Sequence, residues 1–300
     1  MPILSIAVIT MNREEQLRDA LNSCLMCKLF SDTQFVIIDN ASTDSTDIVV
    51  KDVFSNSTYS LYYEKMPNNL GVGGGRNYAY NKSNGEYVYF LDDDAIIDYK
   101  NNPDFFIDAI KIFEKNPKIA TLTSQIYDKS WNSNRINIAG KMVYTGVYLC
   151  KSFCGGSHFL RKKFFEKDPY LSNKYGCEEL LPSLKVFNEG YYNVFCPDLL
   201  VFHCPKTDKW NFKNSNNYNI VIKECSIPYA IKLMMYPRIS YLFLFLAYSR
   251  RCKKYLKHIP DGKKKADDMV KDILIKYHID YRVSINTLIF MFRNFKLTIF

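Results

Sequence analysis

The sequence lacks long apolar runs and a regular cysteine framework. Its longest apolar stretch, residues 239–248, is shorter than the about 20 residues of a membrane-spanning helix. The nine cysteines are odd in number and scattered, which suits a reducing compartment better than a disulfide scaffold. The first ten residues do not resemble a secretory signal peptide. We therefore expect a cytoplasmic protein without a transmembrane helix, although a short interfacial or re-entrant segment stays open.

Two nucleotide-binding signatures are also missing. The glycine stretch NNLGVGGGRN, residues 68–77, is not a GxGxxG motif, because Arg76 occupies the third glycine position. The GK[ST] of a P-loop is absent as well. Glycine lets backbone amides approach an anion closely, and Arg76 would add a fork of donors. Taken alone, the stretch fits a structural turn as well as a phosphate site.

The chain does have enough apolar material for one large domain with an appendage. Of its 300 residues, 47% are hydrophobic and 15% aromatic, which indicates a folded protein. The net charge is +9, but residues 250–265 alone carry eight Lys and Arg against one Asp. The remainder is close to neutral, so we expect no nucleic-acid-binding body. A local anionic partner or a solvated charge run explains the basic segment.

Residues 3–94 alternate strand-like runs with helical patterns. The runs lie at residues 3–9, 35–38, 59–63 and 87–91, and the helical patterns begin near residues 13, 44 and 76. This alternation predicts βαβ units and an α/β fold with a mainly parallel sheet flanked by helices. Asn12 followed by Glu15 predicts a capping box at the start of the first helix.

Beyond residue 100 the periodicity is less regular. Helices are predicted at residues 105–116 and 178–189, and from residue 219 the sequence becomes helical, aromatic and basic. We therefore place a soft boundary near residue 220. The expected organisation is a main domain over residues 1–220, in halves 1–100 and 101–220, followed by a helical region over residues 221–300.

Polar clusters follow three of the predicted strands. They are Thr10 to Asn12, Asp39 with Asn40, and the run Asp92, Asp93 and Asp94. Ligands of open α/β sheets bind at the carboxyl ends of the strands, so these segments should meet at one cleft. Adjacent carboxylates repel by about 1 kcal/mol at a few Å even in water, so we expect a bound cation there.

Four segments in this order resemble a known family. They are IAVITMNR, VIIDNASTDST, NNLGVGGGRN and YVYFLDDDAIID, and they are similar to the nucleotide-sugar half of the family 2 glycosyltransferases with the GT-A fold. The resemblance is strong over residues 3–100 and continues faintly through residues 155–165, 175–193 and 201–205. It implies that residues 1–100 bind a nucleotide-diphosphate sugar and that residues 101–220 bind the acceptor.

The resemblance also implies a reaction. It is the inverting transfer of one sugar to a hydroxyl of a glycan or lipid-linked acceptor, in surface polysaccharide or glycoconjugate synthesis. The QxxRW motif and the membrane helices of processive synthases are missing, which favours single transfer over polymerisation.

Individual residues match the family's donor site. Asp39 matches the aspartate that binds the nucleotide base, with Thr10 and Asn12 lining the same pocket. Arg76 matches a basic residue near the nucleotide. The complete set of substrate-binding residues that we expect is Thr10, Asn12, Arg13, Asp39, Asn40, Gly71, Arg76, Asp92 and Asp93.

Other residues match the metal site and the catalytic base. Asp92 and Asp94 form the family's DxD, which implies a divalent metal, Mn²⁺ or Mg²⁺, on the donor diphosphate. His203 matches a histidine that completes the metal shell, with a structural histidine as the alternative. Glu178 and Glu179 match an acidic pair, of which we predict that Glu179 deprotonates the acceptor. Helix neighbours diverge by about 100°, so only one would face the donor. A plain role at a helix start is the alternative for this pair.

The C-terminal region mixes aromatic and basic residues over residues 227–260. This mixture favours peripheral attachment to the anionic inner face of the cell membrane, with a helical cap or a homo-oligomer contact as the alternative. Two further functions stay open, a sugar nucleotidyltransferase and a non-enzymatic membrane or RNA adaptor. A lysine-bearing, glycine-rich signature is missing near the N-terminus, which argues against the first. The triple aspartate repels nucleic acid, which argues against RNA binding.

Overall fold

The computed structural model describes residues 2–136, 140–172, 176–206, 218–279 and 281–300. The chain divides into two compact units. The first comprises Met1–Val186 and Tyr191–Lys206, and the second comprises Phe187–Gly190 and Thr207–Phe300. The division after Lys206 lies before the boundary near residue 220 that the sequence suggested.

The first unit is built around one sheet. Its order is β3-β2-β1-β4-β10-β6-β11-β9-β8, with β5 added beside β11 and β7 beside β6. The strands are β1 (Leu4–Thr10), β2 (Gln34–Asp39), β3 (Ser60–Lys65), β4 (Tyr87–Asp92), β5 (Ala95–Ile97), β6 (Ile119–Asp128), β7 (Ser133–Asn134), β8 (Met142–Tyr144), β9 (Val147–Leu149), β10 (Ser157–Arg161) and β11 (Tyr192–His203).

The sheet is parallel in one half and mixed in the other. Strands β1 to β4 pair only in parallel among themselves, which confirms the predicted βαβ arrangement. Strand β10 lies antiparallel between β4 and β6, whereas β11 returns to run parallel with β6. The mixed half therefore brings together strands that are far apart in the sequence.

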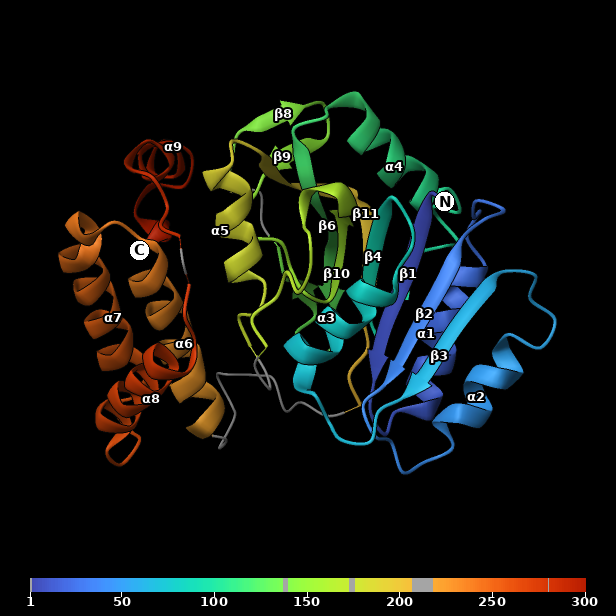
Figure 1. Cartoon of the computed structure of the whole chain (residues 1–300), viewed down its shortest axis with the longest axis horizontal. Coiled ribbons are helices and arrows are strands. Elements are labelled where there is room, and N and C mark those ends of the chain that lie inside the picture. The colour runs from blue at the N-terminus through green and yellow to red at the C-terminus, as the bar shows by residue number, and fades with distance from the viewer. Residues whose placement is uncertain (1, 137–139, 173–175, 207–217, 280) are drawn as a thin grey trace. The chain divides into compact units, whose positions relative to one another are not determined.

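Helices cover both faces of this sheet (Figure 1). Along β1, Leu4, Ile6 and Val8 pack on one face, and Ala7 packs on the other, as the period of two along a strand requires. The first face carries α1 (Glu14–Leu25), α2 (Thr46–Val53) and α4 (Phe105–Lys115), and the second carries α3 (Gly71–Lys82) and α5 (Leu180–Asn188). Burial on both faces explains why these strands are apolar throughout.

The glycine stretch is part of a helix. Helix α3 begins at Gly71, five residues before the position predicted from the sequence, and Gly71 has a φ of +76°. A Cβ on Gly75 would lie 2.9 Å from Ile9 Cγ2 and 3.0 Å from Asn40 Nδ2. Glycine at position 75 therefore lets α3 pack closely on β1 and β2, which the sequence alone did not indicate.

Two local predictions are wrong. The capping box does not form, because Asn12 Oδ1 accepts from Thr43 N at 2.7 Å and the N-cap of α1 is Arg13. The side chain of Asn12 instead fixes the loop after β2. The helix predicted from residue 178 begins at Leu180, so the glutamate pair lies in the turn before it.

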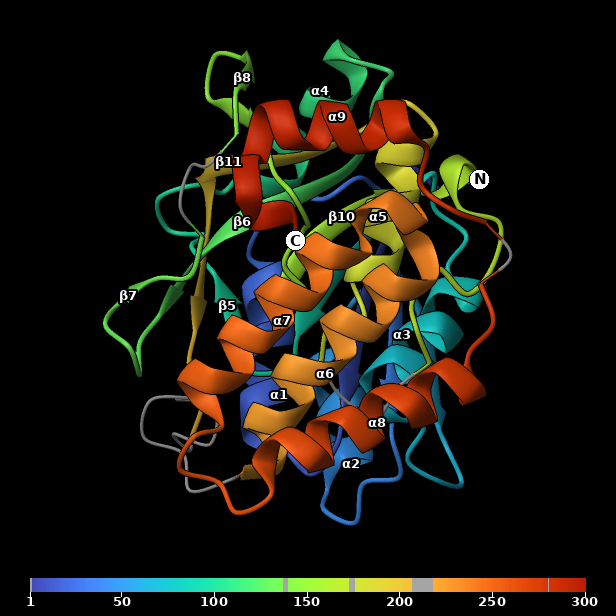
Figure 2. The same cartoon turned by 90° about the vertical axis from the view of Figure 1, so that its left-hand side faces the viewer.

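The second unit consists of helices, which confirms the predicted helical C-terminal region. They are α6 (Tyr218–Met235), α7 (Tyr241–Tyr255), α8 (Gly262–Lys276) and α9 (Ile285–Phe295), with 3-10 turns η2 (Arg238–Ser240) and η3 (Lys296–Ile299). Helices α6, α7 and α8 lie side by side (Figure 2) around Cys225, Tyr248, Cys252 and Val270. Among the residues described, no helix combines the length and hydropathy needed to cross a membrane.

Candidate active site

The triple aspartate lies where β4 ends. Asp92 is the last residue of β4, and Asp93 and Asp94 form the turn into β5. Strand β5 pairs with β11 so that Ala95 is opposite His203, and Cys204 N donates to Asp94 O at 2.8 Å. This pairing brings the histidine beside the aspartates from more than a hundred residues away.

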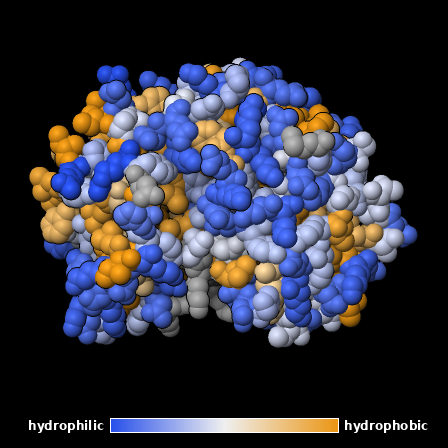
Figure 3. Space-filling view, viewed as in Figure 1, coloured by the Kyte–Doolittle hydropathy of each residue, from blue (hydrophilic) through white to orange (hydrophobic). Residues whose placement is uncertain are grey.

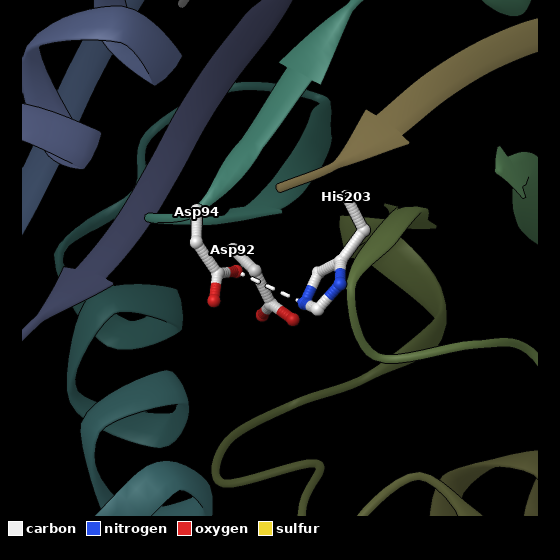
Figure 4. Close-up of side chains that lie close together, drawn as sticks. All are labelled: Asp92, Asp94 and His203. Carbon is white, nitrogen blue, oxygen red and sulfur yellow. Dashed lines mark ion pairs between the residues drawn. The ribbon is translucent and has the colours of Figure 1, made fainter. Parts of the chain in front are cut away.

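Asp92, Asp94 and His203 form a group that fits a metal ion. One ligand atom from each lies within 4.8 Å of the others, and Figure 4 shows the three side chains converging. Bonds of about 2.1 Å place the ligand atoms around Mg²⁺ about 3–4 Å apart, so only a small closure is needed. Carboxylate oxygens and an imidazole nitrogen also suit Mn²⁺.

His203 is held from its far side by Asp128, the last residue of β6. Its Nδ1 lies 3.0 Å from Asp128 Oδ2, and its Nε2 lies 3.2 Å from Asp94 Oδ1. Arg135 Nε donates to the same Asp128 oxygen at 2.8 Å. Arg135 Nη2 also lies 2.9 Å from His203 Nδ1, so the ring is enclosed by two carboxylates and a guanidinium. To ligate a metal through Nε2, the imidazole would carry its hydrogen on Nδ1, toward Asp128.

Arg13 compensates part of the aspartate charge. Its Nη1 lies 2.7 Å from Asp93 Oδ1 and 2.7 Å from Asp94 Oδ2. The positive charge that we expected beside the aspartates is therefore partly supplied by the protein. The expected contact of Arg13 with the donor stays a prediction.

Arg76 connects the aspartates to the glutamate pair. Its Nη2 donates to Asp92 Oδ1 at 2.9 Å, while Nη1 donates to Glu178 Oε1 at 2.6 Å and to Glu179 Oε1 at 3.4 Å. The guanidinium is buried. Both glutamates therefore face this guanidinium, and they lie in a turn rather than in the predicted helix. That only one of them faces the donor stays a prediction. A contact of Arg76 with the nucleotide stays a prediction.

Gly155 leaves the space in which Arg76 and Glu179 meet. A Cβ there would lie 1.9 Å from Glu179 Oε1 and 2.6 Å from Arg76 Nη1. The Gly155 carbonyl also accepts from Arg76 Nη2 at 2.8 Å. A larger residue at this position would push the arginine and the glutamate apart.

The site holds more carboxylates than cations among the residues described. Three guanidinium groups face six carboxylates, those of Asp92, Asp93, Asp94, Asp128, Glu178 and Glu179. Burial raises the pKa of Asp93 to about 6, and burial together with Glu178 raises the pKa of Glu179 to about 8. Burial also acts upward on the pKa of Asp94, but His203 and Arg13 outweigh it and lower that pKa. The excess negative charge favours a divalent cation.

Residues 5–173, more than half of the chain, match the sequence profile described as Glycosyl transferase family 2. The chain belongs to glycosyl transferase family 2. The resemblance found in the four motifs is thereby confirmed.

A relative in Campylobacter jejuni is named GalNAc(5)-diNAcBac-PP-undecaprenol beta-1,3-glucosyltransferase. It is 33% identical over 94 residues, which are 31% of this chain and 30% of that protein. The matched part is thus under a third of the relative's length.

Two solved structures have a similar fold. Residues 1–349 of S. aureus TarS, in complex with UDP-GlcNAc, superpose with a TM-score of 0.64 at 16% identity, over 90% of this chain and 80% of that one. The mannosyltransferase PcManGT from Pyrobaculum calidifontis, in complex with GDP-Man and Mn²⁺, superposes with a TM-score of 0.60 at 15% identity, over 97% of this chain and 78% of that one. These likenesses confirm the predicted α/β GT-A fold.

The residues expected to bind the nucleotide gather at the ends of β1 and β2. Asp39 is fully buried, and its oxygens accept from Ser42 N at 2.7 Å and from Tyr63 OH at 3.0 Å. Thr10 lies opposite Asp39 in the parallel register. Their predicted contacts with the base stay untested by this geometry.

The remaining expected donor residues surround the same edge of the sheet. Asn40 Nδ2 donates to Gly71 O at 3.2 Å, which links the loop after β2 to the start of α3. Asn40 Oδ1 is buried and has no hydrogen-bond partner among the residues described. Asn12 is exposed, and its N donates to Ser42 Oγ at 3.0 Å. The structure thus collects these residues, while their roles stay predictions.

His158 supports the site and was missed from the sequence. It is buried, with Nδ1 3.1 Å from Gly155 O and Nε2 2.6 Å from Tyr170 OH. Because a carbonyl only accepts, Nδ1 carries the hydrogen and Nε2 accepts from Tyr170. Burial and the charge of Arg76 hold the pKa of His158 well below its ordinary value. A neutral histidine therefore fixes the carbonyl that binds Arg76.

Asp128 and Arg135 were also missed. Asp128 stands at the end of a strand in the irregular half of the sequence, where no local pattern marks a site. Its Oδ1 accepts from Ser130 N at 2.9 Å and Ser130 Oγ at 2.6 Å. No strand ending at Asp128 was predicted, so its place at the carboxyl end of a strand became visible only in the structure.

Proposed function

We propose that the protein is a metal-dependent inverting glycosyltransferase. It transfers a single sugar from a nucleotide-diphosphate sugar to a hydroxyl of a glycan or lipid-linked acceptor, in surface polysaccharide or glycoconjugate synthesis. The observation that supports this most directly is the group of Asp92, Asp94 and His203, joined through Arg76 to two glutamates. Membership of family 2 favours this reaction over nucleotidyl transfer.

The residues present fit a divalent cation. Asp92, Asp94 and His203 would hold Mn²⁺ or Mg²⁺, and such an ion supplies electrostatic stabilisation to a departing diphosphate. Arg13 keeps the carboxylate of Asp94 in position, and Asp128 orients the imidazole. The similar mannosyltransferase from P. calidifontis was solved with Mn²⁺.

Glu179 is the base in this proposal. It would take the proton of the acceptor hydroxyl as that oxygen attacks the anomeric carbon, and the bond from this carbon to the diphosphate oxygen breaks on the opposite face. One displacement inverts the configuration. A pKa of about 8 suits a base that works near neutral pH.

The choice between the two glutamates rests on their contacts with Arg76. Glu178 Oε1 lies 2.6 Å from Arg76 Nη1, and Glu178 is buried. Glu178 therefore forms the tighter ion pair with Arg76. Glu179 Oε1 is 3.4 Å from the same Nη1, and the side chain of Glu179 is 18% exposed. Glu179 is therefore freer to accept a proton, while Glu178 stays the alternative base.

The donor would lie along the ends of β1, β2 and β4. We assign the nucleotide to Asp39 and its neighbours, and the diphosphate to the side nearest the metal. The similar structures contain UDP-GlcNAc in TarS and GDP-Man in PcManGT. The set assigned to the donor is Thr10, Asn12, Arg13, Asp39, Asn40, Gly71, Arg76, Asp92 and Asp93.

The acceptor proposal draws on the C. jejuni relative, whose name contains an undecaprenol-linked glycan. A lipid-linked acceptor stays in the bilayer. We therefore propose that the protein works in the cytoplasm, as a peripheral protein of the inner face of the cell membrane.

Calorimetry with UDP, GDP and dTDP, each with and without Mn²⁺, tests the proposal. We expect one nucleotide to bind, with an affinity that rises when Mn²⁺ is present. Asp94→Ala should remove the Mn²⁺ dependence, whereas Asp108→Ala, which changes an exposed aspartate on α4, should not. Absence of binding for all three nucleotides at any Mn²⁺ concentration would contradict the proposal.

A further inference from the structure

The second unit exposes large apolar side chains at the start of α7. We define the α7 face as Ile239, Leu242, Phe243, Phe245 and Leu246, which are 73%, 64%, 51%, 52% and 42% exposed. Figure 3 shows hydrophobic residues gathered over this helix. Ile239 lies in η2 and the other four in α7. Single exposed apolar residues are ordinary, but such a contiguous group marks an interaction surface.

The same side of the helix becomes basic further along. Leu242 and Leu246 are followed at helical spacing by Arg250, and then by Lys254, all exposed. The exposed side of α7 thus changes from apolar at its amino end to cationic at its carboxyl end. Such a side covers both the headgroup layer and the acyl boundary of a bilayer.

Charge is segregated within the second unit. Residues 225–260 contain seven Lys and Arg and no Asp or Glu. Residues 281–300 contain three Lys and Arg and likewise no Asp or Glu. Helix α8, by contrast, carries Asp267, Asp268 and Asp272. Two acidic side chains do contact α7, since Glu224 lies 3.6 Å from Arg251 and Asp267 accepts from Tyr248 OH at 2.9 Å. The helix itself carries no Asp or Glu, and its excess of basic residues favours an anionic partner.

The chain end adds to the same surface. The rings of Phe243 and Phe300 stack with centroids 5.3 Å apart, and Tyr236 OH donates to Ile299 O at 2.9 Å. These contacts hold η3 beside the start of α7, in agreement with Figures 1 and 2. The 3-10 turn brings Leu297, 65% exposed, and Lys296 to the apolar end.

We propose that the α7 face binds the surface of a bilayer that contains anionic lipid. Its apolar side chains enter the boundary between headgroups and acyl chains, and the basic residues of α7 contact lipid phosphates. A second copy of the chain fits this face less well. Pairing two copies through this face would place the cations of one copy against either the cations or the apolar residues of the other, because residues 225–260 contain no carboxylate to pair with them. The attachment goes beyond the transferase reaction and does not depend on it.

Co-sedimentation with vesicles tests the apolar part. The double variant Ile239→Asp with Leu242→Asp should bind phosphatidylcholine–phosphatidylglycerol vesicles at least about tenfold more weakly than the unchanged protein. The control is Ile275→Asp, the same change at an 85% exposed position on α8, and it should bind as the unchanged protein does. Equal binding by the double variant, or equal loss in the control, would overturn the proposal.

Salt and charge variants test the basic part. A basic side chain near an anionic surface contributes about 1 kcal/mol, or about fivefold in partitioning. The triple variant Arg250→Ala, Lys253→Ala, Lys254→Ala should therefore bind these vesicles markedly less, and high salt should weaken the unchanged protein. Lys51→Ala with Lys111→Ala, on α2 and α4, is the matched control and should change nothing. Equal binding to vesicles of phosphatidylcholine alone would contradict an electrostatic contribution and the proposal with it.

Two further measurements separate other outcomes. In analytical ultracentrifugation without lipid, the unchanged protein and the Ile239→Asp, Leu242→Asp variant should have the same oligomeric state. If the unchanged protein self-associates and the variant does not, the partner of the α7 face is a second copy of the chain and the proposal is overturned. Thermal unfolding verifies that each variant is folded. Calorimetry with UDP and Mn²⁺ on the double variant should match the unchanged protein, so a failed vesicle experiment and a failed donor-binding experiment are distinguishable.

Discussion

The two sides of the candidate site are held by different kinds of structure. On the side of the proposed metal, which we call the metal side, Asp92, Asp94 and His203 stand at the ends or turns of paired strands, and strand register sets their spacing. On the side of the proposed base, which we call the base side, the glutamates lie in a turn and are held by Arg76 in a space that Gly155 leaves free. The metal side is therefore rigid by backbone pairing, whereas the base side depends on one ion-pair network.

Arg76 is the link between the two sides. It contacts Asp92 with one nitrogen and the glutamates with the other. A change of charge on one side is therefore transmitted electrostatically to the other. Variants that act on one side only will separate donor binding from proton transfer.

The largest effect is expected from Asp94→Ala, on the metal side. Loss of this carboxylate would remove a proposed metal ligand and leave Arg13 without one of its partners, so turnover should fall by about 10³-fold or more. Donor affinity in the presence of Mn²⁺ should fall as well. Steady-state kinetics and calorimetry measure the two effects, and full activity in this variant would contradict the metal assignment.

Glu179→Gln should affect the base side alone. We expect kcat to fall about 10²- to 10⁴-fold, because the amide cannot take the proton of the acceptor. The Kd for the nucleotide should stay nearly unchanged, since the metal group is intact. If the variant keeps its activity, Glu178 or another group is the base.

Asp128→Asn should have a smaller effect, on metal affinity. The amide has no charge with which to hold His203, so the Mn²⁺ concentration for half-maximal activity should rise about 10- to 100-fold. Excess Mn²⁺ should restore most of the turnover. A loss of activity that Mn²⁺ does not restore would indicate a general structural defect instead.

The smallest effect is a shift in the pH profile of Glu178→Gln. A base must be ionised, so kcat/KM should rise with pH toward about 8, where the pKa of Glu179 lies. Removal of the neighbouring negative charge should lower that pKa and move the rise to lower pH. An unmoved profile would show that the rise belongs to another group.

The raised pKa of Glu179 also predicts how the free energy of unfolding depends on pH. Its folded-state pKa of about 8 lies above the ordinary 4.5, so the folded state favours the protonated form. The free energy of unfolding should therefore decrease as the pH rises from about 4.5 through about 8. In Glu179→Gln this part of the pH dependence should be missing from denaturant titrations.

The parallel half of the sheet was predictable because its signals are local. Apolar runs, helical periodicity and polar residues at strand ends all lie within short stretches of residues 3–94. The structure agrees with them to within a few residues at most boundaries. The capping box at Asn12 failed because a loop 31 residues away offered its side chain a better partner in Thr43.

The rest of the site was not predictable from local pattern. Asp128 and His203 meet because β6 and β11 pair in parallel, and His158 acts through a carbonyl beside Arg76. No periodicity encodes such contacts. The prediction that a helix carries the two glutamates was wrong, because they lie in the turn before α5.

The sequence by itself determined the order of strands and helices in the first unit, the family, and the residue types at the strand ends. These depend on interactions between residues close in the chain, and they leave a periodic trace. Only the tertiary structure decided that Arg13 and Arg76 neutralise part of the carboxylate charge, that Asp128 supports His203, and that the α7 face is exposed among the described residues of the second unit. Those facts depend on pairing and packing between distant segments, whose geometry no local pattern contains.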